Sequence, residues 1–364
     1  MDLGIQGKWA LVCAASKGLG KGRTHAHAHN HDHDHAFDHL VVLSDDRGLF
    51  EHADGVTPRR DHGYCTDDNA RLLAVTTMHP DDGAVRHLNR LALHFVRAAV
   101  AADGSCRNRM DTSGRWTDLP STEDCWGRAL YGLGRAAGHH GNPAVRRWAL
   151  RSFELAARKR SVWSRAMAFA CIGATDVVAA HPDHAAARSL IGDAVATIGE
   201  VPSGTWRWPE PRLRYANATL AEALIAAGAA LADVVVQQRG LDMLEWLLDL
   251  ETATGHLSVT GTAGRGPDDH GAQFDQQPIE VAALADACWR ALRVTGDDSW
   301  TRGVLAAAAW FEGANDVGLV MHDLTTHGGF DGLHAERVNL NQGAESTLAF
   351  VSTMHCVSQL ERVS

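Results

Sequence analysis

Residues 278–294 read Pro-Ile-Glu-Val-Ala-Ala-Leu-Ala-Asp-Ala-Cys-Trp-Arg-Ala-Leu-Arg-Val. The apolar residues of this stretch recur at the three-and-four spacing of a buried helix face: Val281, Leu284, Ala285, Cys288 and Leu292. A second stretch repeats the signature at Leu220, Leu224, Ala227 and Leu231. Both stretches therefore predict helices with one apolar stripe.

Similar periodic segments follow one another from Phe37 to the C-terminus. We expect helices at 37–43, 68–78, 84–101, 123–138, 143–158, 163–180, 184–199, 217–231, 236–250, 278–294, 299–313 and 344–360. Segments that follow long polar motifs alternate with segments that follow short turns. Six helical hairpins closed into a ring fit this pattern, which predicts an all-α, single-domain (α/α)6 toroid over residues 37–364. In such a ring the N-termini of the inner helices gather at one end, where amides and helix dipoles favour hydroxyls and carboxylates.

Composition excludes several classes of protein. The chain has 364 residues, 45% of them hydrophobic, and a net charge of −10 with no basic stripe, which argues against a nucleic-acid partner. The longest apolar run, 220–236, is interrupted by Glu222 and Asp233 and is too short to span a membrane. The seven cysteines are scattered and odd in number, so we expect reduced thiols in a cytoplasmic protein.

The first 36 residues look foreign to the rest. Three of the four lysines lie in the first 21 residues. Residues 1–22 resemble a truncated N-terminus of short-chain dehydrogenases, but the chain has no Tyr with a Lys four residues later, and the pattern stops at Arg23. A fusion scar or a mis-joined reading frame accounts for this segment better than a nucleotide site. The histidine-rich tract 25–39 has metal-ligand chemistry without fixed geometry, so we expect disorder over 1–36 and no cofactor or metal site.

Four polar motifs stand where we expect inner helices to begin. They occupy residues 63–71, 121–128, 273–280 and 331–347. Helix capping accounts for any one of them, with Thr66 and Ser121 as N-caps and Pro278 at a first helical position. All four are richer in amides, carboxylates and arginine than a cap requires, so together they indicate one shared site.

These motifs resemble a known family. From Phe37 onward the chain is similar to the bacterial six-hairpin, (α/α)6-toroid glycosidase-like proteins, which are often described as glycosyltransferases because they occur beside such enzymes or fused to them. The resemblance is carried by residues 44–53, 62–71, 123–130, 274–280 and 341–347. Two departures are visible: Cys125-Trp126 replaces a Ser-His-type pair, and Leu340 replaces an acidic residue. The resemblance implies a carbohydrate-active toroid with a glycosyltransferase as a possible partner.

Glycoside hydrolysis needs two opposed carboxyl groups, about 5 Å apart for retention and roughly 6.5–9.5 Å for inversion. Our first pair is Asp68 and Glu345, with Glu123 and Asp275 behind them. Adjacent helical positions point about 100° apart, so only one of Asp67 and Asp68 should face the cavity. Arginines can adjust carboxyl pKa values, amides can bind hydroxyls and aromatic rings can stack on sugars. The substrate-binding candidates are Tyr64, Asp67, Asn69, Arg71, Asp124, Trp126, Arg128, Trp206, Trp208, Gln276, Gln277, Glu280, Asn341 and Gln342.

Three other functions remain open. A sugar epimerase would use a histidine pair as acid and base, for which His62, His256, His270 and His322 are present. A phosphorylase would need a cationic phosphate pocket, for which Arg265 and Arg337 are present. A non-catalytic glycan-binding partner of a glycosyltransferase would need no opposed carboxylates. The leading hypothesis is a carbohydrate-binding glycoside hydrolase without an organic cofactor.

Overall fold

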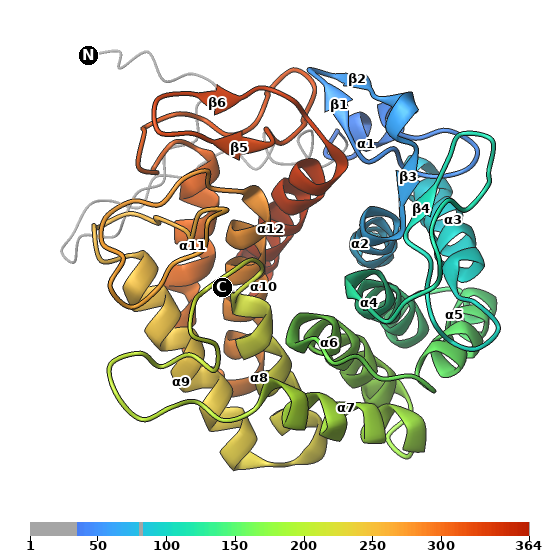
Figure 1. The fold of residues 1–364 in the computed structure, drawn as a ribbon, viewed down its shortest axis with the longest axis horizontal. Coiled ribbons are helices and arrows are strands. Elements are labelled where there is room, and N and C mark those ends of the chain that lie inside the picture. The colour runs from blue at the N-terminus through green and yellow to red at the C-terminus, as the bar shows by residue number, and fades with distance from the viewer. Residues whose placement is uncertain (1–34, 80–82, 364) are drawn as a thin grey trace. The chain divides into compact units, whose positions relative to one another are not determined.

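Twelve α-helices occupy the part of the chain that the computed structural model describes, residues 35–79 and 83–363. Six of them form an inner ring in which each helix packs against the next, and the last packs against the first (Figure 1). The inner helices are α2 (Thr66–Thr77), α4 (Asp124–His139), α6 (Ser164–Ala180), α8 (Ala218–Leu231), α10 (Pro278–Thr295) and α12 (Ala344–Val363).

The other helices form the outer layer. Five of them each pack against the preceding inner helix: α3 (Gly83–Ala99), α5 (Pro143–Ala156), α7 (Ala185–Ile198), α9 (Val234–Glu251) and α11 (Thr301–Phe311). The short α1 (Asp38–Val42) packs against α12, so the two ends of the described chain complete the sixth hairpin. The predicted all-α (α/α)6 toroid is confirmed, with each predicted segment within a few residues of a helix.

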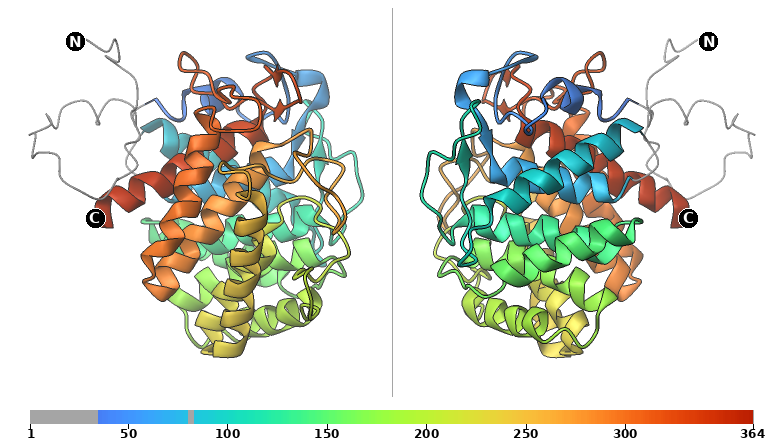
Figure 2. Two further views of the ribbon diagram at one scale, coloured as in Figure 1. Left: turned by 90° about the vertical axis from the view of Figure 1, so that its left-hand side faces the viewer. Right: turned by 90° about the vertical axis from the view of Figure 1, so that its right-hand side faces the viewer.

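The loops before the inner helices contain short strands that the periodicity did not predict. Three antiparallel pairs form: β1 (Ala53–Asp54) with β2 (Thr57–Pro58), β3 (Tyr64–Cys65) with β4 (Arg109–Met110), and β5 (Gly332–Leu333) with β6 (Val338–Asn339). Two 3₁₀ turns, η1 (Arg60–His62) and η2 (Asp298–Trp300), complete the elements. Figure 2 shows these long loops on one face of the ring, with the C-terminal end of α12 at the opposite face.

Helix starts differ in detail from the predicted caps. Pro278 is the first residue of α10, as predicted. Thr66 is not an N-cap; it is the first residue of α2, and the thiol of Cys65 accepts the hydrogen bond from the Asp68 amide. Ser121 also lies outside the cap position, because Glu123 is the N-cap of α4 and its amide donates to the Ser121 hydroxyl. Both predicted caps were therefore wrong by one or two residues.

The core lies between the two layers of helices. The predicted apolar faces of α8 and α10 are buried, including Leu224, Leu284 and Cys288. The six cysteines of the described residues are free and buried, and no described helix is long and apolar enough to cross a membrane. Phe37, the residue at which we expect the folded domain to begin, is buried in the main core. The dehydrogenase-like stretch 1–22 and the histidine tract through residue 34 lie outside the described residues.

Glycines let neighbouring inner helices approach closely. A Cβ at Gly134 of α4 would lie 2.2 Å from the carbonyl oxygen of Gly173 on α6, and a Cβ at Gly127 would lie 2.2 Å from that of Ala166. Both contacts are with backbone, which cannot rotate away as a side chain can. The α4–α6 spacing therefore depends on the absence of side chains at these positions.

We predict that Gly134→Ala lowers the free energy of unfolding by about 1–3 kcal/mol, because the added methyl group forces the two helices apart. Gly192→Ala is the matched control, since Gly192 lies inside outer helix α7 and a methyl group added there would have nothing within 4 Å of it. It should stabilise the protein by about 0.5–1 kcal/mol, because alanine favours helix. Urea unfolding of both variants measures the difference, and a stable Gly134→Ala protein would contradict this account of the packing.

Candidate active site

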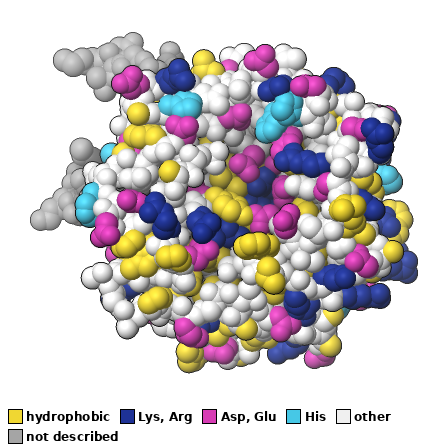
Figure 3. All heavy atoms as spheres, viewed as in Figure 1, with side chains coloured by type: hydrophobic (Ala, Val, Ile, Leu, Met, Phe, Trp, Pro, Cys, Tyr) yellow, Lys and Arg dark blue, Asp and Glu magenta, His cyan; other side chains and the backbone are white. Residues whose placement is uncertain are grey.

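A small cavity opens where the inner helices begin. Its volume is about 60 Å³, and every inner helix or its leading loop contributes to the lining: Arg71, Arg128, Phe169, Ala216, Ile279 and Glu345 are among the lining residues. We call this space the mouth cavity. Figure 3 views this face, where acidic and basic side chains gather around a hollow at the centre of the ring. The polar end of the toroid is where the sequence predicted it.

Arg71 joins the two carboxylates that we expected to form the first pair. One terminal nitrogen of its guanidinium lies 2.5 Å from Asp68, and the other lies 2.6 Å from Glu345. The Asp68 side chain is only 3% exposed, whereas that of Glu345 is 37% exposed. Glu345 and Arg71 line the cavity, whereas Asp68 is not among the lining residues.

The environment of Asp68 raises the pKa of its carboxyl group. Burial raises the pKa of this carboxyl to about 6, although the Arg71 charge opposes the rise and the Glu345 charge adds to it. The second oxygen of Asp68 accepts a hydrogen bond of 3.0 Å from the thiol of Cys65. Burial also raises the pKa of that thiol, so Cys65 remains a donor. Asp68 is thus a carboxyl group that takes up a proton at about pH 6, well above the range of an exposed aspartate.

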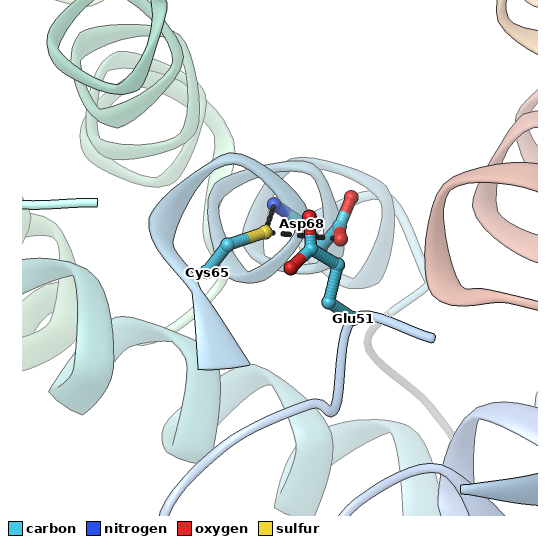
Figure 4. A group of neighbouring side chains, drawn as sticks. All are labelled: Glu51, Cys65 and Asp68. Carbon is cyan, nitrogen blue, oxygen red and sulfur yellow. Dashed lines mark hydrogen bonds between the residues drawn. The ribbon is translucent and has the colours of Figure 1, made fainter. Parts of the chain in front are cut away.

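Glu51, Cys65 and Asp68 form a group with the spacing of metal ligands (Figure 4). Their donor atoms all lie within 4.8 Å of one another. Each donor already has a partner, because Arg109 pairs with Glu51, Arg71 pairs with Asp68, and Cys65 keeps its proton. A cation would have to displace two arginines and a proton. The group fits a polar network that supports Asp68 better than it fits a metal ion.

Arg128 lines the mouth cavity from the first turns of α4. Only 7% of this residue is exposed, and its guanidinium lies over the ring of Phe169, 3.5 Å from the ring centroid. Burial, with Arg71 nearby, lowers the pKa of Arg128 to about 10. Asp124, at the start of the same helix, has its carboxyl pKa raised by burial. Both predicted residues lie near the mouth, and Arg128 is on its wall.

The predicted tryptophans do not offer stacking faces to a ligand in this cavity. Trp126 is fully buried and donates to the carbonyl of Ala156. Trp208 is also fully buried and stacks on Trp246, against which Trp206 packs edge-on. The predicted rim role of Trp208 is wrong because α9 supplies Trp246, a packing partner that the local sequence did not reveal, whereas that of the half-buried Trp206 stays a prediction.

Most of the predicted sugar-binding amides hold loops instead. Asn69 donates to the carbonyl oxygens of Leu49 and Cys65, and Gln276 is bonded to Trp310 and Asp316. Two amides of the last motif are engaged as well, because Asn341 accepts from the Gly55 amide and Gln342 is bonded to Asp323 and Thr326. Asn69, Gln276 and Gln342 have both their donors and their acceptors engaged within the protein, and Asn341 has its acceptor engaged, which explains the amide-rich motifs as loop supports.

Two further residues that we predicted to bind substrate, Tyr64 and Glu280, have structural roles instead. The Tyr64 hydroxyl donates to Asp45 at 2.6 Å and its ring stacks on Phe50, so the side chain is fully buried. Glu280 accepts hydrogen bonds from the amides of Ala216 and Asn217, which fixes the loop before α8. Burial nevertheless raises the pKa of Glu280 to about 7.

The remaining predicted residues lie outside the cavity lining. Asp67 accepts from Asn108 at 2.8 Å, and Asp275 is paired with His334 at 2.5 Å. Glu123 is exposed at the N-cap of α4, and Gln277 is half-buried at the N-cap of α10. A catalytic or binding role for these four residues stays a prediction.

A larger cavity, the rear cavity, occupies the C-terminal side of the inner ring. Its volume is about 630 Å³, within the roughly 300–1,000 Å³ that ligand pockets span. Tyr131, Glu222, Asp286 and Ser352 line both cavities, which makes them the boundary between the two. The acids of the rear cavity are paired: Asp176 with Arg135, Glu222 with Arg290, and Asp286 with Ser352.

Glu222 and Asp286 line both cavities and are acidic residues that the sequence reasoning did not include among the site candidates. Burial raises the pKa of Glu222 to about 7 and also raises that of Asp286. The available signal was an acid in the interior of each apolar helix, Glu222 in the predicted helix 217–231 and Asp286 in 278–294. A lone acid on a buried helix has to face a partner or a cavity.

Comparisons with known proteins bear on the fold. The sequence matches no protein-family model and no curated protein. Solved structures do match: a sugar epimerase from a ruminal bacterium has 12% identity over 89% of this chain and 96% of its own, with a TM-score of 0.66. Cellobiose 2-epimerase from Bacillus thermoamylovorans has 12% identity, 91% and 97% coverage and a TM-score of 0.65. The GH76 alpha-mannanase of Bacteroides thetaiotaomicron has 10% identity, 92% and 98% coverage and a TM-score of 0.61.

This chain has the six-hairpin toroid fold. The three matches cover nearly the whole length of each protein, so the likeness extends over the complete ring. Identity near one residue in ten establishes the fold alone, and the reaction has to be argued from the site.

We predict that Arg71→Met lowers the free energy of unfolding by about 3–5 kcal/mol at pH 8, because it leaves the Asp68 carboxylate buried without its cation. The loss should shrink below about pH 6, where Asp68 takes up a proton in the folded state. Adding Asp68→Asn to Arg71→Met should recover part of the loss. Arg115→Met, at a side chain that is 79% exposed, is the control and should change stability little. Urea unfolding at pH 8 and at a pH below about 6 measures these effects. An equal loss of unfolding free energy at both pH values would contradict them.

Proposed function

We propose that this protein is a glycoside hydrolase whose reaction takes place at the mouth cavity, with Asp68 and Glu345 as the carboxyl pair. The observation that carries the proposal is the Arg71 bridge, which holds both groups at the polar end of the ring. Two oxygens bonded to one guanidinium lie on the order of 4–7 Å apart, a range that overlaps both retaining and inverting geometries.

The two carboxyls have different environments, as an acid and a base require. Asp68 is buried, with a pKa of about 6, and serves as the general acid that protonates the leaving oxygen. Glu345 is more than a third exposed and lines the cavity, where its carboxylate acts on the anomeric carbon or on a water molecule. Asp68 is not among the residues that line the cavity and is paired with Arg71, which is, so this proposal requires the Arg71 side chain to move before substrate can take up the Asp68 proton.

The comparisons support a carbohydrate substrate. The matched proteins include sugar epimerases and mannanases, and an alpha-1,6-mannanase of Salegentibacter in which two consecutive aspartates are replaced is described as inactive. Asp67 and Asp68 are consecutive aspartates at the start of an inner helix. No histidine is among the described residues that line the mouth cavity, which favours carboxylate chemistry over the histidine pair of an epimerase.

We expect Asp68→Asn and Glu345→Gln each to lower kcat for glycoside hydrolysis by about 10²–10⁴-fold, because an amide neither donates a carboxyl proton nor acts as a base or nucleophile. Release of reducing sugar from a panel of α- and β-linked oligosaccharides, with and without phosphate, measures the effect. Glu245→Gln is the control, since Glu245 is exposed on the outer helix α9.

The other outcomes of this assay each point to a different function. Sugar release that requires phosphate would identify a phosphorylase, and an isomeric product without bond cleavage would identify an epimerase. No turnover, with glycan binding unchanged in both variants, would overturn the enzyme proposal and favour a binding partner of a glycosyltransferase.

We also predict that the hydrolysis rate falls as the pH rises above about 6. Asp68 must carry a proton to act as the acid, and its protonated fraction falls about tenfold for each pH unit above its pKa of about 6. Initial hydrolysis rates from pH 4 to 9 measure this decrease. A rate that stays constant or increases between pH 6 and 8 would show that Asp68 is not the acid.

A further inference from the structure

Arg128 differs from the other buried arginines of the inner ring. Its guanidinium makes no hydrogen bond and no ion pair with any residue of the described chain, and it lies over the ring of Phe169. Arg71 is bonded to two carboxylates, whereas Arg135, Arg165 and Arg290 each have one carboxylate partner. The unpaired cation lies on the wall of the mouth cavity.

A guanidinium that is only 7% exposed and has no carboxylate partner has lost most of its hydration without gaining an ion pair, which favours binding of an acceptor from a ligand. The carboxylates of Asp67, Asp124 and Glu345 act on Arg128 through space, but none lies within the 4.0 Å of an ion pair. Arg71 repels Arg128 and offsets part of that attraction. The N–H groups of Arg128 therefore have no acceptor within the described chain and are free to bind one from a ligand.

The stacking on Phe169 orients these donors. A ring that covers one face of the guanidinium leaves its in-plane edge for hydrogen bonds, and that edge matches the two oxygens of a carboxylate or phosphate. Because only 7% of the residue is exposed before any ligand arrives, little further desolvation accompanies ligand binding.

We propose that Arg128 is a binding residue for an anionic group on the sugar, a carboxylate or a phosphate, so that the substrate is an acidic saccharide. The proposal rests on the mouth cavity being the site of the proposed glycosidase. The proposal narrows the substrate class to uronic acids or phosphorylated sugars. A site of carboxylates and amides alone would bind neutral sugars.

The test compares ligands that differ only in charge. Isothermal titration of the full chain with D-glucuronate, D-glucose 6-phosphate and D-glucose should give at least tenfold tighter binding of one charged ligand than of glucose. Glucuronate and glucose 6-phosphate distinguish a carboxylate from a phosphate as the preferred group. Equal binding of charged and neutral sugars by the wild-type protein would overturn the proposal.

Variants of Arg128 assign the preference to this residue. Arg128→Met should abolish the tenfold preference and leave the melting temperature equal to or above that of the wild type, because it removes an unpaired buried charge. Arg128→Lys, which keeps the charge but not the fork of donors, should retain part of the preference. Arg151→Met, at an exposed position on the outer helix α5, is the control. A preference that survives Arg128→Met, or that disappears only because this variant melts at a lower temperature, would also overturn the proposal.

Failure of this inference and failure of the proposed function are distinguishable. Hydrolysis of neutral glycosides without any preference for charged sugars would overturn the anion site and keep the hydrolase. Tight binding of glucuronate that depends on Arg128, without cleavage of any uronide, would keep the anion site and overturn the hydrolase.

Discussion

The ion pairs of Arg71 join the two ends of the inner ring. Arg71 and Asp68 belong to α2, the first inner helix, and Glu345 belongs to α12, the last. These two helices are distant in sequence and meet only where the ring closes. The bridge therefore couples closure of the toroid to assembly of the proposed carboxyl pair. A ring that failed to close would leave Asp68 and Arg71 facing solvent and Glu345 without its cation.

Buried charge along the ring axis is managed by pairing. Asp176 and Glu222 each have an arginine partner, and Asp286 is held by hydrogen bonds from α12. Such pairs fix the orientation of helices that otherwise present mostly small apolar residues to one another. Against this background an arginine without a partner is unusual. In the mouth cavity the guanidinium of Arg128 has no ion-pair partner and is therefore able to bind a ligand.

The helical pattern was predictable because outer helices bury one face and show a period of 3.6 residues, whereas inner helices such as α6 and α8 are buried on nearly all sides and read as long apolar runs. The site was predictable only in part. Asp68, Arg71, Arg128 and Glu345 meet because inner-helix N-termini share one face of the ring, a consequence of topology that the hairpin count already implied. Asn69, Gln276 and Gln342 carry the same donors and acceptors as sugar-binding amides, and only their bonds to neighbouring loops reveal that they support structure.

The sequence by itself determined the helices, their alternation and the end of the ring where polar chemistry gathers, because each follows from local periodicity and from residues beside a helix start. Only the tertiary structure decided which polar side chains remain free. Trp208 stacks on Trp246, Glu280 accepts hydrogen bonds from the loop before α8, and the N–H groups of Arg128 have no partner among the described residues. The reason is that a partner for a side chain can come from any element that packs beside it, and such partners are set by contacts between residues far apart in the chain.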